Sequence, residues 1–344
     1  MRRLRILNGP LDYAKDLAAS ASRGWNAFFF SPADPTPLGL IRIATGALLA
    51  WSLAILGLDL RAFLGSDGWA DPFVVRSFLA DRGSYGWSFW LAVPDALLWP
   101  AWGLCLVVLL MFAAGLFSRV TAPLAWVIAV STAQRVPVML FGFDQVIAFW
   151  ALYCAVTGAS GQALSLDRWR GGRSGPPLPT VPANLSLRLI QLQLCVIYGM
   201  AGLAKLQGAA WWNGTAFGMV LLTREFRSMI DVSWLVRYPW AVNLATHVTI
   251  AFELLYPALI WNRLARPILI ALAVLLHLGI GLTLGLNEFG LAMIAANLAF
   301  LRLDWLREGA FGGTKADDPA RRAVNRGPRS GSPGPRGPAG RTAT

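Results

Sequence analysis

Charged residues are scarce in this sequence and make up 14% of its 344 residues. A soluble domain carries about 25% charged and about 45–50% apolar residues, whereas hydrophobic residues account for 56% here. This balance argues against a soluble globular enzyme, a coiled coil and a disordered protein. Cysteine occurs only three times, which excludes a disulfide-stapled secreted module. The composition therefore indicates a membrane protein that crosses the bilayer several times.

Histidine is equally scarce, with two residues in the chain, and neither has a carboxylate three or four positions away. Because the cysteines also lack metal-ligand spacing, we expect no metal site. Lysine and arginine outnumber acidic residues by 30 to 18. No basic stripe alternates with aromatic residues, however, so nucleic-acid binding is not expected.

Apolar runs of about 20 residues are long enough to cross a bilayer. The sequence contains eight candidate spans, which predict an all-α transmembrane bundle: 37–57, 97–118, 121–139, 142–160, 186–206, 241–261, 267–285 and 286–303. Basic residues gather on one side of these spans, as they do in cytoplasmic loops. We therefore expect a multi-pass cell-membrane protein with both termini in the cytoplasm. Arginine far outnumbers lysine, which is typical of a GC-rich bacterial gene.

The expected spans divide the chain into three parts. Residues 1–30 form an amphipathic cytoplasmic segment, residues 31–305 the transmembrane domain, and residues 306–344 a basic cytoplasmic tail. The tail has too few apolar residues to offset the entropy of ordering, so we expect it to be disordered. The Trp-rich outer loops 58–96 and 207–240 are expected to contain helices that lie along the membrane surface.

Ionisable residues inside apolar spans are costly, so each indicates a structural partner or a function. With this topology, six of them lie at mid-membrane or nearer the outer face: Asp144, Lys205, His247, Glu253, His277 and Glu288. A converging set of base, acid and imidazole is what a proton-transfer site requires. We interpret the carboxylates of this set as groups that tune the charge of the site, although Glu253 in protonated form is an alternative.

Three arginines have simpler interpretations. Arg135 and Asp144 flank one outer turn and are expected to form an ion pair that links two helices. Arg42 and Arg188 lie near cytoplasmic span ends, where a long side chain reaches the surface by snorkelling.

One face of the span at 186–206 is polar or small. Its members recur at steps of four and three residues, the period of a helix: Gln191, Cys195, Tyr198, Gly202 and Lys205. We therefore expect this face to contact protein rather than lipid. Lys205 is the last residue of this face and is followed closely by Trp211 and Trp212. Two interpretations of Lys205 remain open. Lys205 is either a headgroup anchor that snorkels or a proton acceptor kept out of water.

A glycine groove runs along the span at 267–285, because His277, Gly281 and Gly285 are four residues apart. Such a groove permits close packing of a neighbouring helix. It also leaves room for a flat ligand beside His277.

Three stretches of the chain resemble the HTTM domain, the membrane module shared with vitamin K-dependent gamma-carboxylase. They are PLGLIRIATGALLAWSLAILGLDLRAFLGSDG (37–68), RLIQLQLCVIYGMAGLAKLQGAAWWNGTAF (188–217) and HLGIGLTLGLNEFGLAMIAANLAFL (277–301). The resemblance covers roughly residues 31–305.

The resemblance implies that a motif lysine deprotonates vitamin K hydroquinone, and Lys205 in AGLAKL is the matching position. His277 matches the histidine of the later span, so we interpret both as catalytic. A quinol or another lipophilic substrate would then be bound by Tyr198, Gly202, Trp211, Trp212, His247 and Gly281. The family histidine near the start of the fourth span is replaced by Asp144 in FGFDQ. The carboxylase adds a large lumenal portion that residues 306–344 do not match, so peptide carboxylation is not expected.

Three functions fit these features. The first is a membrane enzyme that acts on a quinol or another lipophilic substrate with Lys205 as base. The second is a non-catalytic binding or transport module, although the halves lack the internal repeat usual in transporters. The third is a structural partner in a membrane assembly. The protein partner, if any, is unknown.

Overall fold

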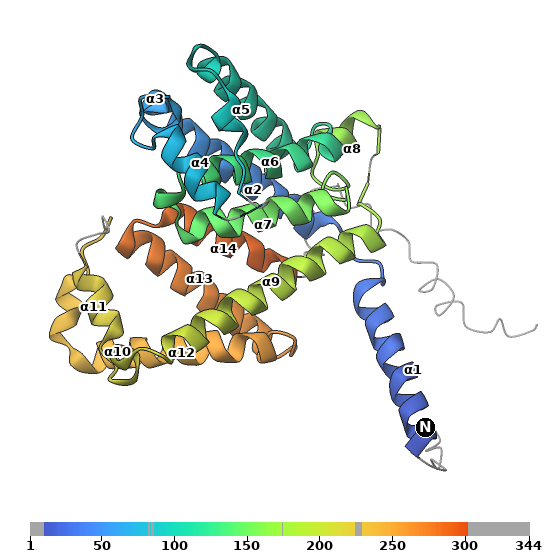
Figure 1. Ribbon diagram of the computed structural model, residues 1–344. Coiled ribbons are helices and arrows are strands. Elements are labelled where there is room, and N and C mark those ends of the chain that lie inside the picture. Colours follow the sequence, from blue (N-terminus) through green and yellow to red (C-terminus); the bar gives the residue numbers. More distant parts are fainter. Residues whose placement is uncertain (1–9, 82, 84–85, 174, 224–228, 302–344) are drawn as a thin grey trace, which may run out of the picture. The chain divides into compact units, whose positions relative to one another are not determined.

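The computed structural model of the protein describes residues 10–301, apart from 82, 84–85, 174 and 224–228. Across these residues the chain is helical, with fourteen α-helices and no strand beyond one isolated β-bridge between Ala33 and Thr180 (Figure 1). The predicted all-α class is confirmed. The expected disordered tail at 306–344 and the end of the last expected span lie outside the described residues.

A helix forms at every position where the sequence predicts a span. These eight helices are α2 (Thr36–Leu58), α5 (Leu98–Ala114), α6 (Ser118–Arg135), α7 (Gly142–Val156), α9 (Val181–Lys205), α12 (Pro239–Leu259), α13 (Ala265–Leu284) and α14 (Asn287–Asn297). The remaining helices of the described chain are short, apart from α1: α1 (Pro10–Phe29), α3 (Leu60–Leu64), α4 (Pro72–Ala80), α8 (Leu166–Arg170), α10 (Ala209–Trp212) and α11 (Ala216–Leu222).

The expected number of about eight spans is not confirmed. Within the described residues, five helices are long and apolar enough to cross a membrane: α2, Asp95–Ala114 (η3 and α5), α9, α12 and α13. Helix α7 has 15 residues and α14 has 11. A helix of 15 residues is about 22 Å long, shorter than the hydrocarbon core of about 30 Å. Helix α6 has 18 residues but is less apolar than the five.

Helix α2 lies at the centre of the bundle and packs against α5, α7, α9 and α14, while α9 packs along α12 and α13 along α14. Small residues permit these approaches, as is common between membrane helices. A Cβ at Gly46 of α2 would lie 2.7 Å from the backbone of Ala113, and one at Gly202 of α9 would lie 2.9 Å from the Leu254 side chain. Close packing of the helices therefore requires glycine at both positions.

The two faces of α9 differ as the sequence predicts. Gln191, Tyr198 and Gly202 are buried in protein, and Cys195 and Lys205 are half-buried. The opposite face is apolar and exposed, which suits contact with lipid: Leu192, Val196, Met200 and Leu203. Burial of the polar face is confirmed.

Arg42 is fully buried, so the expectation that it snorkels is wrong. Its guanidinium donates to the carbonyl oxygens of Ser160 (2.6 Å), Ala163 (3.2 Å), Leu164 (2.5 Å) and Ala113 (3.4 Å). Exposed carbonyls at helix ends and in loops need donors wherever water is absent, and one guanidinium supplies several. Arg42 therefore ties α2 to the end of α5 and to the loop that follows α7.

Arg135 also satisfies backbone carbonyls, in this case those around the loop that follows α3. The expected ion pair between Arg135 and Asp144 is not formed. Arg135 is buried and donates to backbone carbonyls at the end of α3 and in the segment after it: those of Leu64, Gly65 and Ala70. The Asp144 carboxylate instead accepts from the backbone N–H of Phe141 and caps its own helix. Three loop carbonyls satisfy more guanidinium donors than one carboxylate already used as a cap.

Arg188 contacts protein rather than extending freely toward the surface. It donates to the carbonyl of Phe28 (3.1 Å) and to the Gln191 side chain (2.9 Å), and its guanidinium lies 4.1 Å from the centre of the Phe28 ring. Asn184 also donates to the Phe28 carbonyl. The end of α1 is thereby held against α9, while the rest of α1 is exposed.

Asp167 of α8 caps the start of α6, which has no side-chain cap of its own. Its two carboxylate oxygens accept from the backbone N–H groups of Phe117 and Ser118, each at 2.7 Å. Burial alone would raise the pKa of Asp167, but these hydrogen bonds outweigh it and hold the pKa below its usual value. The cap also fixes Phe117, whose φ of 50° lies in the left-handed region.

Replacing Arg42 by Met should destabilise the protein by about 3–5 kcal/mol, because four carbonyls lose their donor and a buried charged network is broken. Equilibrium unfolding of the purified protein in mild detergent measures this change. Arg119→Met is the matched control, because Arg119 is exposed and its loss should have little effect. Equal stability of the two variants would contradict the role given to Arg42.

Candidate functional site

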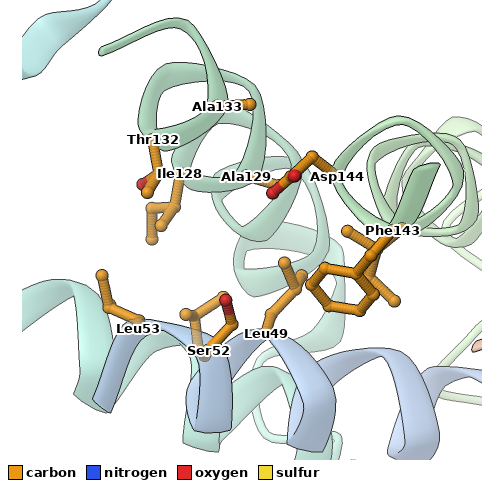
Figure 2. A pocket seen from close by; sticks show the side chains of 11 residues that line it. Leu49, Ser52, Leu53, Ile128, Ala129, Thr132, Ala133, Phe143 and Asp144 are labelled. Carbon is orange, nitrogen blue, oxygen red and sulfur yellow. The ribbon is translucent and has the colours of Figure 1, made fainter. Parts of the chain in front are cut away.

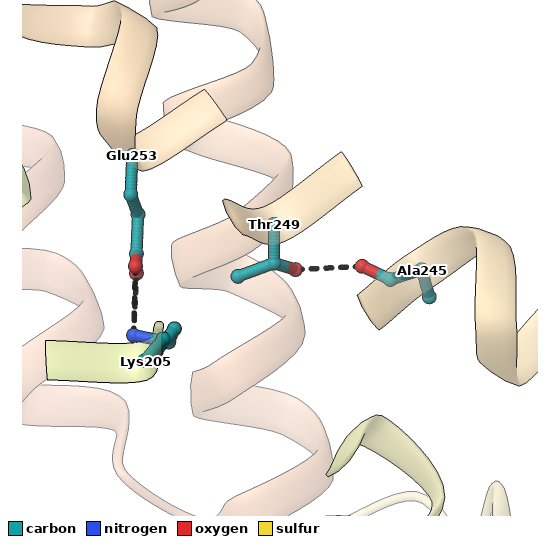
Figure 3. Close-up of polar contacts among 4 residues, drawn as sticks. All are labelled: Lys205, Ala245, Thr249 and Glu253. Carbon is teal, nitrogen blue, oxygen red and sulfur yellow. Dashed lines mark hydrogen bonds and ion pairs between the residues drawn. The ribbon is translucent and has the colours of Figure 1, made fainter. Parts of the chain in front are cut away.

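Lys205 is the last residue of α9 and forms an ion pair with Glu253 of α12 (Figure 3). Its Nζ lies 2.8 Å from each carboxylate oxygen of Glu253, and the exposed fractions of the two side chains are 22% and 8%. The ring of Trp211 lies 5.1 Å from the same ammonium. Lys205 is therefore held between protein groups, and the pair is the one salt bridge found in the described part of the chain.

Thr249 precedes Glu253 by one turn of α12 but does not compete for Lys205. Its hydroxyl donates to the carbonyl of Ala245 in its own helix, at 2.8 Å (Figure 3). This hydroxyl is not hydrogen bonded to Lys205, so Glu253 is the side chain that accepts from the ammonium. The ion pair thus depends on the packing of α9 along α12.

A second polar cluster joins four helices through buried side chains. Tyr198 of α9 and His277 of α13 are hydrogen bonded, with 2.8 Å between the Tyr198 Oη and the His277 Nε2. The amide of Asn297 lies 3.3 Å from the same Oη, and Tyr256 donates to the other end of that amide at 2.7 Å. All four side chains are at most 3% exposed. We call this set the tyrosine–histidine network.

The ion pair and the tyrosine–histidine network occupy neighbouring levels of the same two helices. Lys205 follows Tyr198 by seven residues, which is two turns or about 10 Å along α9. Glu253 precedes Tyr256 by one turn of α12. No hydrogen bond links Lys205 to His277 in the described chain. The two predicted catalytic residues thus share a helix pair but not a direct contact.

His247 and Trp212 lie at the edge of this region. His247 is exposed, and its Nδ1 contacts the carbonyl of Asn243 in the same helix at 2.9 Å. Trp212 is 64% exposed and donates to the carbonyl of Leu206. Of the predicted binding residues after α9, only Trp211 contacts Lys205.

Asp144 and Glu288 belong to a different part of the bundle. Asp144 lines a pocket between α2, α5, α6 and α7 (Figure 2), together with Leu49, Ser52, Leu53, Leu109, Ile128, Ala129, Thr132, Ala133, Phe143 and Ile147. Glu288 at the start of α14 lies within electrostatic range of Asp144. Neither carboxylate contacts the ion pair in the described chain, so the six ionisable residues do not form a single cluster. No group of three or more potential metal ligands occurs among the described residues.

The glycine groove of α13 is filled by α14. A Cβ at Gly281 would lie 3.1 Å from Asn287, and a Cβ at Gly290 of α14 would lie 2.5 Å from the His277 carbonyl. Gly285 forms the turn between the two helices with a φ of 71°, a conformation that favours glycine. The sequence allows either a neighbouring helix or a flat ligand in this groove. Beside Gly281 the space is taken by the neighbouring helix α14.

Tyr256 and Asn297 are not among the predicted site residues, although the sequence around each carries a signal. Asn297 is an uncharged polar residue within the apolar run LAMIAANLAF, where a buried amide needs partners. Tyr256 follows Glu253 by three residues and so lies on the same face of the helix. Neither side chain is a carboxylate, an amine or an imidazole, so the set of six candidates includes neither of them.

The helices and the buried polar groups define a multi-pass membrane protein of helical-bundle type. The family model of the HTTM domain matches residues 30–305. The match covers most of the chain, so the protein belongs to the HTTM domain family, as its resemblance predicts. No curated protein and no solved structure matches the chain.

Removal of one partner of the ion pair should destabilise the protein by about 3–5 kcal/mol, because the other charge stays partly buried and uncompensated. We expect this for Lys205→Met and for Glu253→Gln, whereas the double variant should recover a large part of the loss. Detergent unfolding curves of the four proteins give the coupling energy. Lys15→Met on exposed α1 is the control, and purely additive losses would show that the pair makes no contribution.

Proposed function

We propose that the protein binds a lipophilic quinol and removes a proton from its hydroxyl group, with Lys205 as the base. The observation that supports this proposal is the ion pair of Lys205 and Glu253, held between α9 and α12 beside Trp211. A base for quinol chemistry needs limited contact with water and a nearby group that controls its proton. The resemblance of AGLAKL to the carboxylase motif supports the same assignment.

In this proposal Glu253 regulates the protonation state of Lys205. Transfer of one proton from the Nζ to the carboxylate, over 2.8 Å, gives a neutral amine and a neutral acid. The amine then accepts the quinol proton, which leaves a quinolate anion beside a lysine ammonium. No net charge enters the membrane in the first step, and the ammonium stabilises the anion formed in the second.

The aromatic residues around the ion pair suit a flat apolar ligand. Trp211 lies against the ammonium, and Trp212 exposes its ring after α10. Aromatic rings provide large apolar contact areas for a quinol ring. Tyr198, two turns before Lys205 on α9, and its partner His277 on α13 supply polar groups for a second oxygen of the ligand.

A non-catalytic role is the second candidate. The close packing of α14 into the glycine groove, together with the pairing of Lys205 with Glu253, is also what a binding module or a structural partner in a membrane assembly would have. In that case the polar groups stabilise helix contacts and transfer no proton.

The test is anaerobic titration of the protein in lipid nanodiscs with menadiol, the reduced form of menadione. The wild-type protein should convert part of the bound menadiol into its anion, which absorbs at longer wavelength than the neutral quinol. Lys205→Met should bind menadiol but form at least about tenfold less anion, because one charge-assisted hydrogen bond to the anion is lost. Lys15→Met should behave as wild type.

The same titration separates the candidates. Binding with equal anion formation in wild type and Lys205→Met would identify a non-catalytic binding module. Absence of binding to the wild-type protein would contradict both an enzyme and a binding module for quinols, and would leave the structural role.

We propose further that both termini lie in the cytoplasm, which requires an even number of crossings. Five crossings would place the termini on opposite sides. If all five long helices cross, at least one of the shorter helices α6, α7 and α14 must cross as well. Fusions of alkaline phosphatase and of a fluorescent protein to each terminus measure its side. Both termini should give fluorescence without phosphatase activity, and a fusion in the loop after α10 should give the reverse.

A further inference from the structure

The orientation of the Asn297 amide is determined by its neighbours. One end of this amide lies 2.9 Å from the carbonyl oxygen of Met293, which is only an acceptor, so that end is the NH₂ group. The other end is therefore the oxygen, and it accepts from the hydroxyl of Tyr256 at 2.7 Å. The second hydrogen of the NH₂ group then points to the hydroxyl oxygen of Tyr198.

The direction of this bond decides the tautomer of His277. Tyr198 already accepts a hydrogen bond from Asn297, so its own O–H is free to donate, and the acceptor at 2.8 Å is Nε2 of His277. An Nε2 that accepts carries no proton, and a neutral imidazole then carries its proton on Nδ1. The tyrosine–histidine network thus runs in one direction, from Tyr256 through Asn297 and Tyr198 to His277.

The opposite tautomer leaves more polar groups unsatisfied. If Nε2 carried the proton, it would donate to Tyr198, whose own O–H would then have no acceptor among the described residues. Nδ1 would also remain without a partner. The assigned tautomer leaves one unsatisfied group instead of two, and buried polar groups are nearly always satisfied.

That remaining group is the Nδ1–H of His277. The side chain is 3% exposed, and Nδ1 has no hydrogen-bond partner in the described part of the chain. The ring of Phe289, centred 5.6 Å from the imidazole, meets it at 74°. A buried N–H donor beside an aromatic ring suits an acceptor atom on an otherwise apolar ligand.

We propose that His277 is held as the Nδ1–H tautomer and that this N–H donates to a carbonyl oxygen of a lipophilic quinone. The tautomer follows from the hydrogen bonds alone, whereas the choice of a quinone, the oxidised form of the quinol, rests on the function proposed above. His277 is therefore a donor that binds and orients the ligand. The nitrogen that would act as a base, Nε2, is occupied by Tyr198.

Histidine labelling tests the tautomer directly, because the chain has only two histidines. In a His247→Gln variant labelled with [¹⁵N]histidine, nuclear magnetic resonance reports one imidazole and shows which of its nitrogens is protonated. We expect a proton on Nδ1. Tyr198→Phe removes the donor to Nε2 and should give a mixture of tautomers. A proton on Nε2, or a mixture in the parent protein, would overturn the proposal.

Addition of menadione tests whether the Nδ1–H of His277 donates to a quinone carbonyl. Nanodiscs of ether-linked lipids are used so that menadione supplies the only ligand carbonyls. Its binding is measured separately by equilibrium dialysis. Bound menadione should shift the Nδ1 resonance more than the Nε2 resonance. Bound menadione that leaves Nδ1 unchanged overturns the donor role but not the proposed function. Absence of menadione binding overturns the ligand named here and leaves the tautomer assignment, whereas the menadiol titration described above decides the proposed quinol function.

Two substitutions separate the two ring nitrogens. By bond count, the amide of Asn reaches the position of Nδ1, whereas the amide of Gln reaches that of Nε2 and retains the contact with Tyr198. His277→Asn should keep most of the affinity for menadione. His277→Gln should lose about tenfold, as expected for one hydrogen bond. Stronger binding by His277→Gln than by His277→Asn would overturn the donor role.

Discussion

The structure depends on one constraint: a polar group inside an apolar bundle must find its partner within the protein. Arg42 and Arg135 satisfy it by donating to loop carbonyls, and Lys205 and Glu253 satisfy it by pairing. Each solution joins segments that are far apart in the sequence, so the same contacts that remove unsatisfied groups also position the helices. An apolar interior alone would leave the helices free to slide, because lipid is as apolar as the helix surfaces.

The α9–α12 pair shows how this constraint produces a candidate site. Gly202 lets the two helices approach closely, and this approach brings Lys205 within 2.8 Å of Glu253. The same helix pair places Tyr198 and Tyr256 around Asn297. An ion pair and a buried hydrogen-bond network therefore lie on one helix interface, and such contacts hold polar side chains in fixed positions.

Much of the fold could be predicted, because helix position and the buried face of α9 depend on local patterns. The period of Gln191, Tyr198 and Gly202 is enough to identify that face. The partner of a side chain could not be predicted in this way: proximity in sequence pairs Arg135 with Asp144, but Arg135 binds the end of α3 and the segment after it. The expected number of about eight spans is not confirmed, since apolar runs continue into turns and 3₁₀ segments that leave α7 and α14 short.

By itself the sequence determined the membrane environment, the eight helical segments, the family and the identity of Lys205 and His277 as notable polar residues. These properties follow from composition and from the spacing of nearby residues, and both can be read directly from the sequence. Only the tertiary structure decided that Lys205 pairs with Glu253, that His277 bonds to Tyr198, and that Asp144 lies elsewhere. The reason is physical: a hydrogen bond depends on distances of about 3 Å between helices, and spacing within one helix does not specify how far its neighbour is rotated or shifted.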